Sequence, residues 1–312
     1  MSSIRFFLIF LLVLILCVPF MLLPLRLSMA LGDALGRLAY LLLRSRRAVT
    51  VDGIRQSIAT GAIESPKTAE DIAKDSFCHL GISFAEIVKV YSGRGQKVMD
   101  SISIDGIENL RLALSYGKGV LFVTGHYGNW ELLALYCARA LRRIRVVARR
   151  QDNPFLNSFV ERVREGFGNT VIYKEGALKN VLRELKSGGA VGILCDQSVI
   201  EREGVLVDFL GRPAWTMKMP IVISQKTGAP LLPTFMRRVP SGHRITFHAP
   251  FVPDREASLV NHLEHLNRFL EDQIREDPSQ WLWMHRKWKR TTQRDKNEHS
   301  EYGQSQPKPP SS

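Results

Sequence analysis

Short apolar runs and longer helical stretches alternate over most of the chain. Apolar runs bounded by glycine or polar residues predict buried strands at 119–125, 145–148, 190–195, 230–235 and 245–248. Apolar residues at helical spacing predict helices at 129–141, 153–165, 176–186 and 259–274. This alternation predicts an α/β fold with a central, largely parallel or mixed sheet flanked by helices.

The N-terminal pattern is different, because no charged residue occurs from Phe6 to Leu25. Twenty helical residues extend roughly 30 Å, about the hydrocarbon thickness of a bilayer. Pro19 and Pro24 can kink or end this helix, and such breaks are tolerated within membranes. We therefore predict a transmembrane helix. The alternative, a cleaved signal peptide, is disfavoured by the length of the run and by the absence of a small-residue cleavage site close behind it.

Arginines are distributed unevenly around this helix. Arg5 precedes it, and five arginines follow: Arg26, Arg37, Arg44, Arg46 and Arg47. The positive-inside rule then places the bulk of the chain on the cytoplasmic side.

We divide the chain into a membrane anchor (1–29), a partly interfacial helical segment (30–98), an α/β core (99–290) and a polar tail (291–312) that we expect to be disordered. In the second part, leucines recur at helical spacing at positions 31, 35, 38 and 42. They predict an amphipathic helix that either lies on the bilayer surface or packs against the core.

The 312 residues carry 43 Lys and Arg against 30 Asp and Glu, a net charge of +13. This surplus predicts an anionic partner, either a membrane surface, a phosphorylated substrate or nucleic acid. Nucleic acid ranks low because the chain contains no groove-reading or single-strand-binding motif. Four scattered cysteines exclude a disulfide scaffold and make a zinc site of familiar spacing unlikely, and we expect neither a metal nor a cofactor.

The strongest candidate site follows the first predicted strand, in the stretch TGHYGNWE that ends at Glu131. His126 lies in a glycine-flanked turn, where open α/β sheets place their ligands, and it can act as a general base near neutral pH. Glu131 can hold the imidazole and balance its charge. The plainer alternative is a buried histidine with one hydrogen bond and a glutamate that interacts with the helix dipole.

Four sequence blocks give this site a context. They are TGHYGNWEL, the residues Asn153, Pro154, Arg164 and Gly168, the residues Asp196 and Gln197 with VDFLGRP and Thr216, and PSQWLWMHRKWK at 278–289. Together they resemble the bacterial lipid A late acyltransferases, the lauroyl and myristoyl transferases within the glycerolipid acyltransferase superfamily. The sequence departs from that pattern at Ser279, at Gly166, at Asp208–Leu210 and in the loop SVIERE, and the last of these departures bears on the details of substrate contact.

The resemblance implies a bacterial inner-membrane enzyme that transfers a fatty acyl chain from acyl carrier protein to a hydroxyl of a lipid A precursor. It implies His126 as the base and Glu131 as its companion, with no acyl-enzyme intermediate. Turn amides around Gly128 and Asn129, or an arginine, would stabilise the oxyanion. Arg164 would stabilise charge or bind substrate phosphate, and Asp196 would hold Arg164 or shape the pocket.

Two basic clusters suit a phosphorylated lipid, an acidic carrier protein or an anionic membrane surface. One is formed by six arginines between 139 and 150, and the other by Arg286, Lys287, Lys289 and Arg290 with Trp283 and Trp288 between them. The alternatives are an acyltransferase for another glycolipid or lysophospholipid, with acyl-CoA or acyl carrier protein as donor, and a non-catalytic protein that binds anionic lipid. A lipid hydrolase is disfavoured because the chain contains no GxSxG motif.

Overall fold

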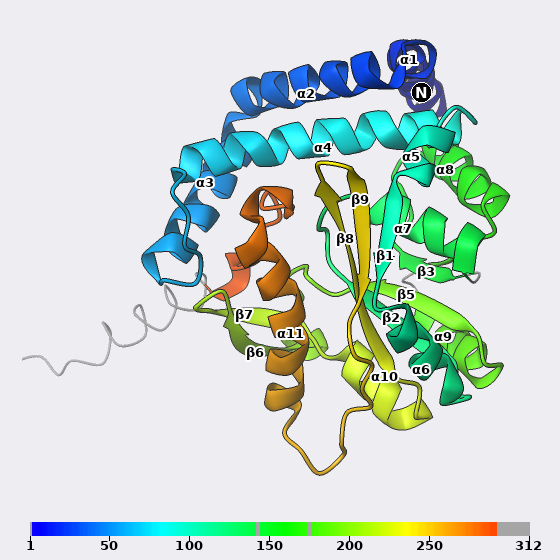
Figure 1. Cartoon of the computed structure of the whole chain (residues 1–312), viewed down its shortest axis with the longest axis vertical. Helices are drawn as coiled ribbons and strands as arrows, with labels where there is room; N and C mark the ends of the chain where they lie inside the picture. The colour runs from blue at the N-terminus through cyan, green and yellow to red at the C-terminus, as the bar shows by residue number, and fades with distance from the viewer. Residues whose placement is uncertain (1, 142–143, 174–175, 292–312) are drawn as a thin grey trace, which may run out of the picture.

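A seven-stranded mixed sheet forms the centre of the described structure (Figure 1). The structure is a computed structural model that describes residues 2–141, 144–173 and 176–291. The predicted tail from residue 292 onward lies outside the described residues. In sheet order, the strands are β1 (Ile102–Asp105), β9 (Gly242–Phe247), β8 (Leu231–Val239), β2 (Val120–Thr124), β5 (Ala190–Leu194), β3 (Arg145–Ala148) and β4 (Thr170–Tyr173). The prediction of a mixed α/β fold is confirmed.

The register of the central strands positions the candidate site. Strand β2 pairs in parallel with both β5 and β8, whereas β8 and β9 are antiparallel. Thr124, at the end of β2, lies opposite Leu194, at the end of β5. The segments that follow these two strands therefore emerge side by side at the carboxyl edge of the sheet, where open α/β sheets bind their ligands.

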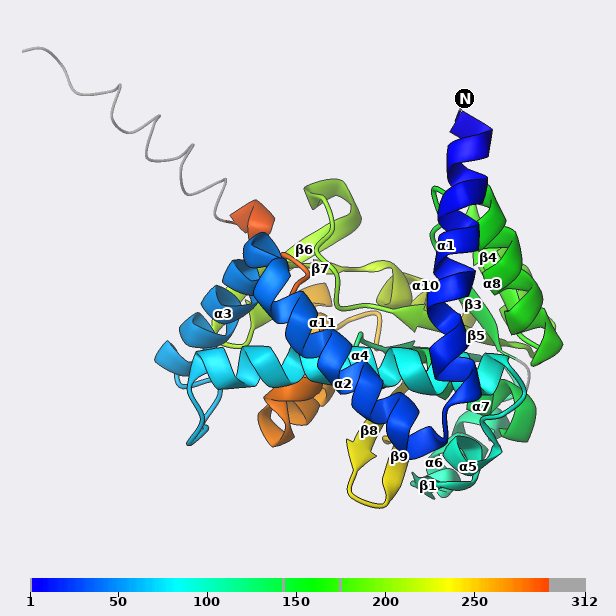
Figure 2. The ribbon, with the colours of Figure 1, turned by 90° about the horizontal axis from the view of Figure 1, so that it is seen from above.

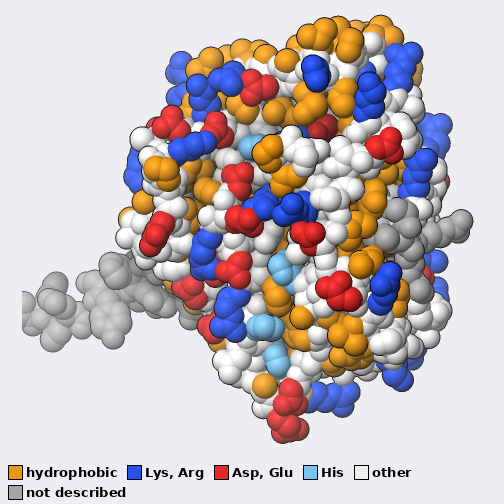
Figure 3. Space-filling view, viewed as in Figure 1, with side chains coloured by type: hydrophobic (Ala, Val, Ile, Leu, Met, Phe, Trp, Pro, Cys, Tyr) orange, Lys and Arg blue, Asp and Glu red, His pale blue; other side chains and the backbone are white. Residues whose placement is uncertain are grey.

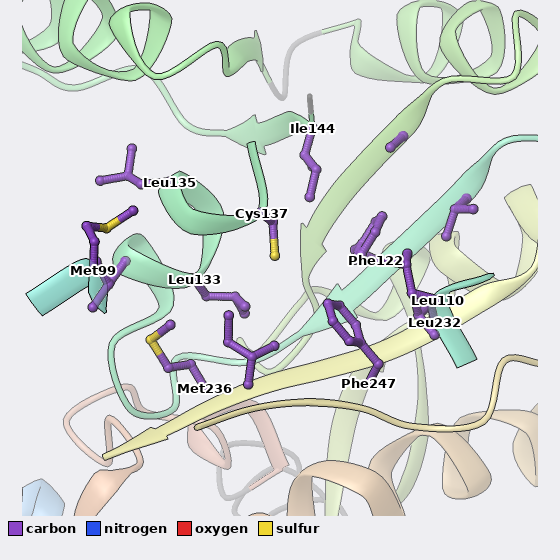
Figure 4. Close-up of a cluster of buried hydrophobic side chains, with 14 of the residues drawn as sticks. Met99, Leu110, Phe122, Leu133, Leu135, Cys137, Ile144, Leu232, Met236 and Phe247 are labelled. Atoms are coloured by element: carbon purple, nitrogen blue, oxygen red, sulfur yellow. The ribbon is translucent and has the colours of Figure 1, made fainter. Parts of the chain in front are cut away.

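Helices cover both faces of the sheet. Along the chain, the helices are α1 (Ser2–Leu22), α2 (Leu25–Leu42), α3 (Arg44–Ala59), α4 (Ala69–Tyr91), α5 (Gln96–Asp100), α6 (Ile107–Ser115), α7 (Trp130–Tyr136), α8 (Pro154–Gly166), α9 (Ala177–Lys186), α10 (Met219–Thr227) and α11 (Leu259–Glu276). Alternate residues of β2 point to opposite faces. Phe122 packs with α5, α6 and α7 (Figure 4), whereas Leu121 and Val123 pack with α9, α10 and α11.

The N-terminal helices pack through glycine rather than leucine. Helix α2 packs on α4 (Figure 1) and crosses it obliquely (Figure 2), and its buried residues are Ser28, Gly32 and Gly36. A methyl group on Gly36 would collide with the carbonyl oxygen of Phe77, so the two backbones approach as closely as only glycine permits. Of the four leucines, Leu31 is partly buried against Phe20, whereas Leu35, Leu38 and Leu42 are exposed, Leu38 at 49%. The alternative that this face packs on the core is therefore wrong.

Helix α1 continues through Pro19 and ends at Leu22. Its segment Ser3–Leu22 is long and apolar enough to cross a membrane, and it is the one such helix in the described part of the chain. Most of its large apolar side chains are exposed. One side contacts α8, where the ring centroids of Phe7 and Phe155 are 5.3 Å apart (Figure 2).

The C-terminal segment is pinned to the turn after β2. The amide of Gly128 donates to the carbonyl of Gln280 at 2.9 Å, and the amide of Leu282 donates to the carbonyl of His126 at 2.9 Å. Trp283 and Lys287 are both 1% exposed. The expectation that these two residues belong to a surface cluster is wrong, because the segment folds inward against the hairpin of β6 (Gly204–Phe209) and β7 (Arg212–Met217).

All five predicted strands are present, and the four predicted helices occur as α7, α8, α9 and α11. The first of these is shorter than expected, because α7 ends at Tyr136 and a π-helical turn, Cys137–Leu141, continues it. Strands β1 and β4 and the β6–β7 hairpin were not predicted.

Candidate active site

His126 is paired with Asp196. The Nδ1 atom of the imidazole lies 2.7 Å from Oδ1 of the carboxylate, and the backbone amide of His126 donates to Oδ2 at 2.8 Å. The indole N–H of Trp281 donates to the same Oδ2 atom at 2.9 Å. The carboxylate thus accepts three hydrogen bonds in a buried position, which fixes the ring and directs its Nε2 atom away from Asp196.

The pair shifts the pKa of both members. Burial acts to raise the pKa of Asp196, but the charge of His126 and the hydrogen bonds to the carboxylate outweigh it and lower this pKa. Burial acts to lower the pKa of His126, but the charge of Asp196 and the hydrogen bond to it raise this pKa above its usual value. The arrangement therefore stabilises an imidazolium that forms during a reaction.

Glu131 does not hold the imidazole. Its carboxylate accepts a hydrogen bond from the guanidinium of Arg164 at 2.6 Å. The expectations that Glu131 orients His126 and that Asp196 holds Arg164 are both wrong. Each carboxylate has the other's expected partner: Asp196 bonds to His126, and Glu131 bonds to Arg164. Glu131 lies in the first turn of α7 and reaches Arg164 on α8, whereas Asp196 follows the strand that neighbours β2.

Gly128 and Asn129 serve the backbone of the turn. Gly128 has a φ of +57°, and a side chain there would collide with the carbonyl oxygen of Met236, so only glycine fits. Its amide is already bonded to Gln280, which contradicts the expectation of a free oxyanion donor. Asn129 caps α7 by accepting from the amide of Leu132 at 3.1 Å.

A buried polar network anchors this cap to α4. The side-chain amide of Asn129 donates to Glu86 at 3.0 Å. Glu86 also accepts from the guanidinium of Arg238 and lies 3.0 Å from Nε2 of His243. Burial opposes ionisation of Glu86, but His243 and Arg238 lower its pKa to about 2. The cap is therefore held by an ionised carboxylate inside the protein.

The side chain of Gln197 faces the free nitrogen of His126 and links it to His285. The amide nitrogen of Gln197 lies 3.3 Å from Nε2 of His126 and 3.3 Å from Nε2 of His285. The two imidazole centroids are 4.7 Å apart. Burial, followed by the charge of His126, lowers the pKa of His285 to about 4, so this ring is neutral near pH 7. Sequence reasoning quoted both residues within motifs but gave them no role, since only the fold brings them to His126.

An apolar cavity lies between α7 and the sheet. Phe122, Cys137 and Ile144 approach one another there (Figure 4), and Trp130, Glu131 and Arg164 also line it. The ring of Trp130 packs against His126 at a centroid distance of 5.0 Å. The cavity thus begins beside the His126–Asp196 pair and continues into the hydrophobic interior.

Residues 2–290 match the family model of bacterial lipid A biosynthesis acyltransferases. The chain belongs to this family. It is therefore an acyltransferase, and its family assigns it to secondary acylation in lipid A biosynthesis. Of the residues named from the resemblance, the lipid A acyltransferase structure brings His126 together with Asp196 and Arg164 together with Glu131.

Curated relatives agree with the lipid A acyltransferase family. The chain is 23% identical over 262 residues to a lipid A biosynthesis palmitoleoyltransferase of Escherichia coli (strain K12), covering 83% of this chain and 84% of that one. It is 23% identical over 266 residues to the lipid A biosynthesis lauroyltransferase of the same organism, covering 83% and 84%. It is also 31% identical over 135 residues to a phosphatidylinositol mannoside acyltransferase of Mycobacterium tuberculosis (strain ATCC 25618 / H37Rv), covering 42% of each chain.

Proposed function

We propose that this protein transfers a fatty acyl chain from an acyl-carrier-protein thioester to a hydroxyl of a lipid A precursor, with His126 as the general base. The observation that carries the proposal is the hydrogen-bonded pair of His126 and Asp196 beside an apolar cavity, whose lining residue Trp130 packs against His126. The pair supplies a base oriented by a buried carboxylate, and the cavity supplies an environment for an acyl chain.

The proposed reaction needs one proton acceptor and no covalent enzyme intermediate. With its Nδ1–H donated to Asp196, His126 keeps an unprotonated Nε2 atom, which removes the proton of the acceptor hydroxyl. The alkoxide oxygen attacks the thioester carbonyl carbon and forms a tetrahedral oxyanion. The carbon–sulfur bond then breaks, the imidazolium returns the proton to the leaving thiolate, and an ester and a thiol are released.

The oxyanion requires hydrogen-bond donors near Nε2 of His126. Gln197 lies at this position and His285 lies next to Gln197, and we assign them that role in place of Gly128 and Asn129. A neutral His285 can donate one hydrogen bond without repelling the imidazolium that forms on His126.

The apolar cavity receives the donor acyl chain in this scheme. Arg164 and Glu131 lie among its lining residues, so their ion pair closes the polar end of an otherwise apolar space. Helix α1, the exposed leucine face of α2 and the net charge of +13 support attachment to an anionic inner-membrane surface, with the catalytic part on the cytoplasmic side.

A second acceptor class is favoured by one observation. The region of 31% identity belongs to a relative named for acylating a phosphatidylinositol mannoside. Acyl transfer to another phosphorylated glycolipid or lysophospholipid, from acyl carrier protein or acyl-CoA, is therefore the alternative.

Incubation of the full chain with labelled acyl donors and acceptor lipids, followed by mass spectrometry, tests the proposal. We expect one acyl group added to the lipid A precursor from acyl carrier protein. Faster transfer from acyl-CoA, or to a phosphatidylinositol mannoside or lysophospholipid, would support the alternative. Hydrolysis of the thioester without transfer to any lipid would contradict both.

A further inference from the structure

A second apolar space lies between α2 and α4. It has a volume of about 1020 Å³, counting its open side, and we call it the α2–α4 groove. Leu35 and Ala39 of α2, with Leu43 directly after the helix, form one wall, and Phe77 and Phe84 lie on its α4 side. Leu35 and Ala39 are four residues apart and therefore share one helix face. The groove exists because α2 contacts α4 through its glycines, which leaves room beside the contact.

The groove reaches the catalytic site. Trp130 and Glu131 line both the groove and the cavity assigned to the donor chain. Trp130 also packs against His126. Two aliphatic chains, one in each space, would therefore both reach the imidazole that must contact the acceptor hydroxyl.

The surroundings of the groove favour a membrane lipid as its occupant. Its α2 wall belongs to the helix on which Leu35, Leu38 and Leu42 are exposed, and hydrophobic side chains gather along this edge of the molecule among charged ones (Figure 3). A lipid in the bilayer could therefore enter sideways, without its chain crossing water. The donor chain, which a soluble carrier protein would deliver, has no need of such an entrance.

Arginines mark the other end of the groove. Leu43 lines the groove, and the exposed Arg44 and Arg46 lie one and three residues after it. The guanidinium of Arg46 donates to the carbonyl of Met284 at 3.4 Å, and Met284 lines the groove as well. Among the described residues, neither arginine forms an ion pair with a carboxylate. Positive charge beside an apolar groove suits a lipid that carries phosphate.

We propose that the α2–α4 groove binds the acyl chain that bears the acceptor hydroxyl, and that Arg44 and Arg46 bind a phosphate of the same lipid. This inference rests on the proposed acyl transfer to a phosphorylated glycolipid. It adds a separate subsite for the acceptor and an entrance from the bilayer.

Photocrosslinking tests the subsite without requiring turnover. The probe is a bisphosphorylated, acylated glucosamine disaccharide with a diazirine in its hydroxyacyl chain, irradiated with the full chain in nanodiscs. We expect peptides of residues 35–43 and 77–87 to be labelled, with competition by the unlabelled disaccharide and not by phosphatidylglycerol. Labelling confined to other segments, or equal competition by phosphatidylglycerol, would overturn the proposal.

Matched variants sharpen the test. Ala39→Trp fills the groove, whereas Leu38→Trp places the same bulk on the exposed face of the same helix. We expect Ala39→Trp alone to lose labelling and to raise the KM for the acceptor about tenfold, as if roughly two methylene groups returned to water, with the KM for the donor unchanged. Equal effects of the two variants, or a raised KM for the donor, would count against the groove.

The phosphate contact has its own control. Arg46→Gln should weaken labelling by the bisphosphorylated probe and leave labelling by a dephosphorylated probe unchanged. Arg26→Gln, at the other end of α2, should change neither. Equal losses with both probes would overturn the assignment of Arg46. If the groove is labelled but the protein transfers no acyl group, the proposed function is wrong and the lipid-binding site is still supported. If the protein transfers acyl groups but other segments are labelled, only the assignment of the groove is wrong.

Discussion

The imidazole of His126 and the carboxylate of Asp196 form a 2.7 Å hydrogen bond across 70 residues of sequence. The bond exists because β2 and β5 are parallel neighbours, so that the residues after each strand meet at one edge of the sheet. Asp196, and not Glu131, is therefore the carboxylate that sets the tautomer and the pKa of the proposed base.

Replacing Asp196 should change both the rate and its pH dependence. In the wild type, Asp196 raises the pKa of His126, and activity should increase as His126 loses its proton. Asp196→Asn should shift this acidic limb to lower pH and reduce kcat on the order of 10²- to 10⁴-fold, because the required tautomer is no longer favoured. Trp281→Phe keeps the carboxylate and should leave the acidic limb in place. An unshifted limb in Asp196→Asn, measured by kcat/KM from pH 5 to 9, would contradict the assignment.

The ion pair of Glu131 and Arg164 should act as a unit. We expect Glu131→Gln and Arg164→Gln each to lower kcat/KM. The kcat/KM of the double variant should be only slightly lower than that of the less active single variant. The corresponding coupling is roughly 0.5–3 kcal/mol for directly bonded partners. The ion pair of Arg145 and Glu184, 2.7 Å apart and outside the cavity lining, provides a control cycle without coupling in activity. Additive losses for Glu131 and Arg164 would show that the two residues act separately.

The strands that position the site were predictable because glycine-bounded apolar runs mark β2 and β5. Their adjacency was not predictable, since sheet order depends on packing along the whole chain. Glu131 is close to His126 in sequence, but it lies in the first turn of α7 and bonds to Arg164. The leucine pattern of α2 likewise did not identify the buried face. Helix α2 packs closely through Gly32 and Gly36, which lie on a different face of the helix.

Donor chain length should respond to the cavity under α7. Ala134 lines the cavity, and Ala134→Leu should shift selectivity toward shorter donors by roughly tenfold or more, since one methylene that no longer fits an apolar pocket costs about 1–3 kcal/mol. Competition between acyl carrier proteins with different chain lengths measures the shift. Ala138 lies one turn further along the helix and outside the cavity lining, so Ala138→Leu should leave the selectivity for donor chain length unchanged. Unchanged selectivity in Ala134→Leu would place the donor chain elsewhere.

Glu86 should stabilise the protein most at neutral pH. Its folded pKa of about 2 lies below the ordinary value of 4.5, so its contribution is complete above pH 4.5 and is lost as the pH falls toward 2. Glu86→Gln leaves Arg238 without its buried carboxylate and should cost on the order of 3–5 kcal/mol at pH 7. The difference from the wild type in denaturant unfolding should shrink as the pH falls toward 3. Glu108→Gln, an exposed control, should have the same free energy of unfolding as the wild type at pH 7 and at pH 3. If Glu86→Gln differs from the wild type by the same amount at pH 7 and pH 3, this role of Glu86 is contradicted.

Single-turnover transfer by His126→Ala tests the central claim most directly. The measurement follows, by mass spectrometry, the acyl group moving from acyl carrier protein to the lipid A precursor, with near-ultraviolet circular dichroism verifying an intact fold. A general base at His126 predicts a rate reduced on the order of 10²- to 10⁴-fold. Transfer by the folded variant within a few-fold of the wild-type rate would contradict the mechanism.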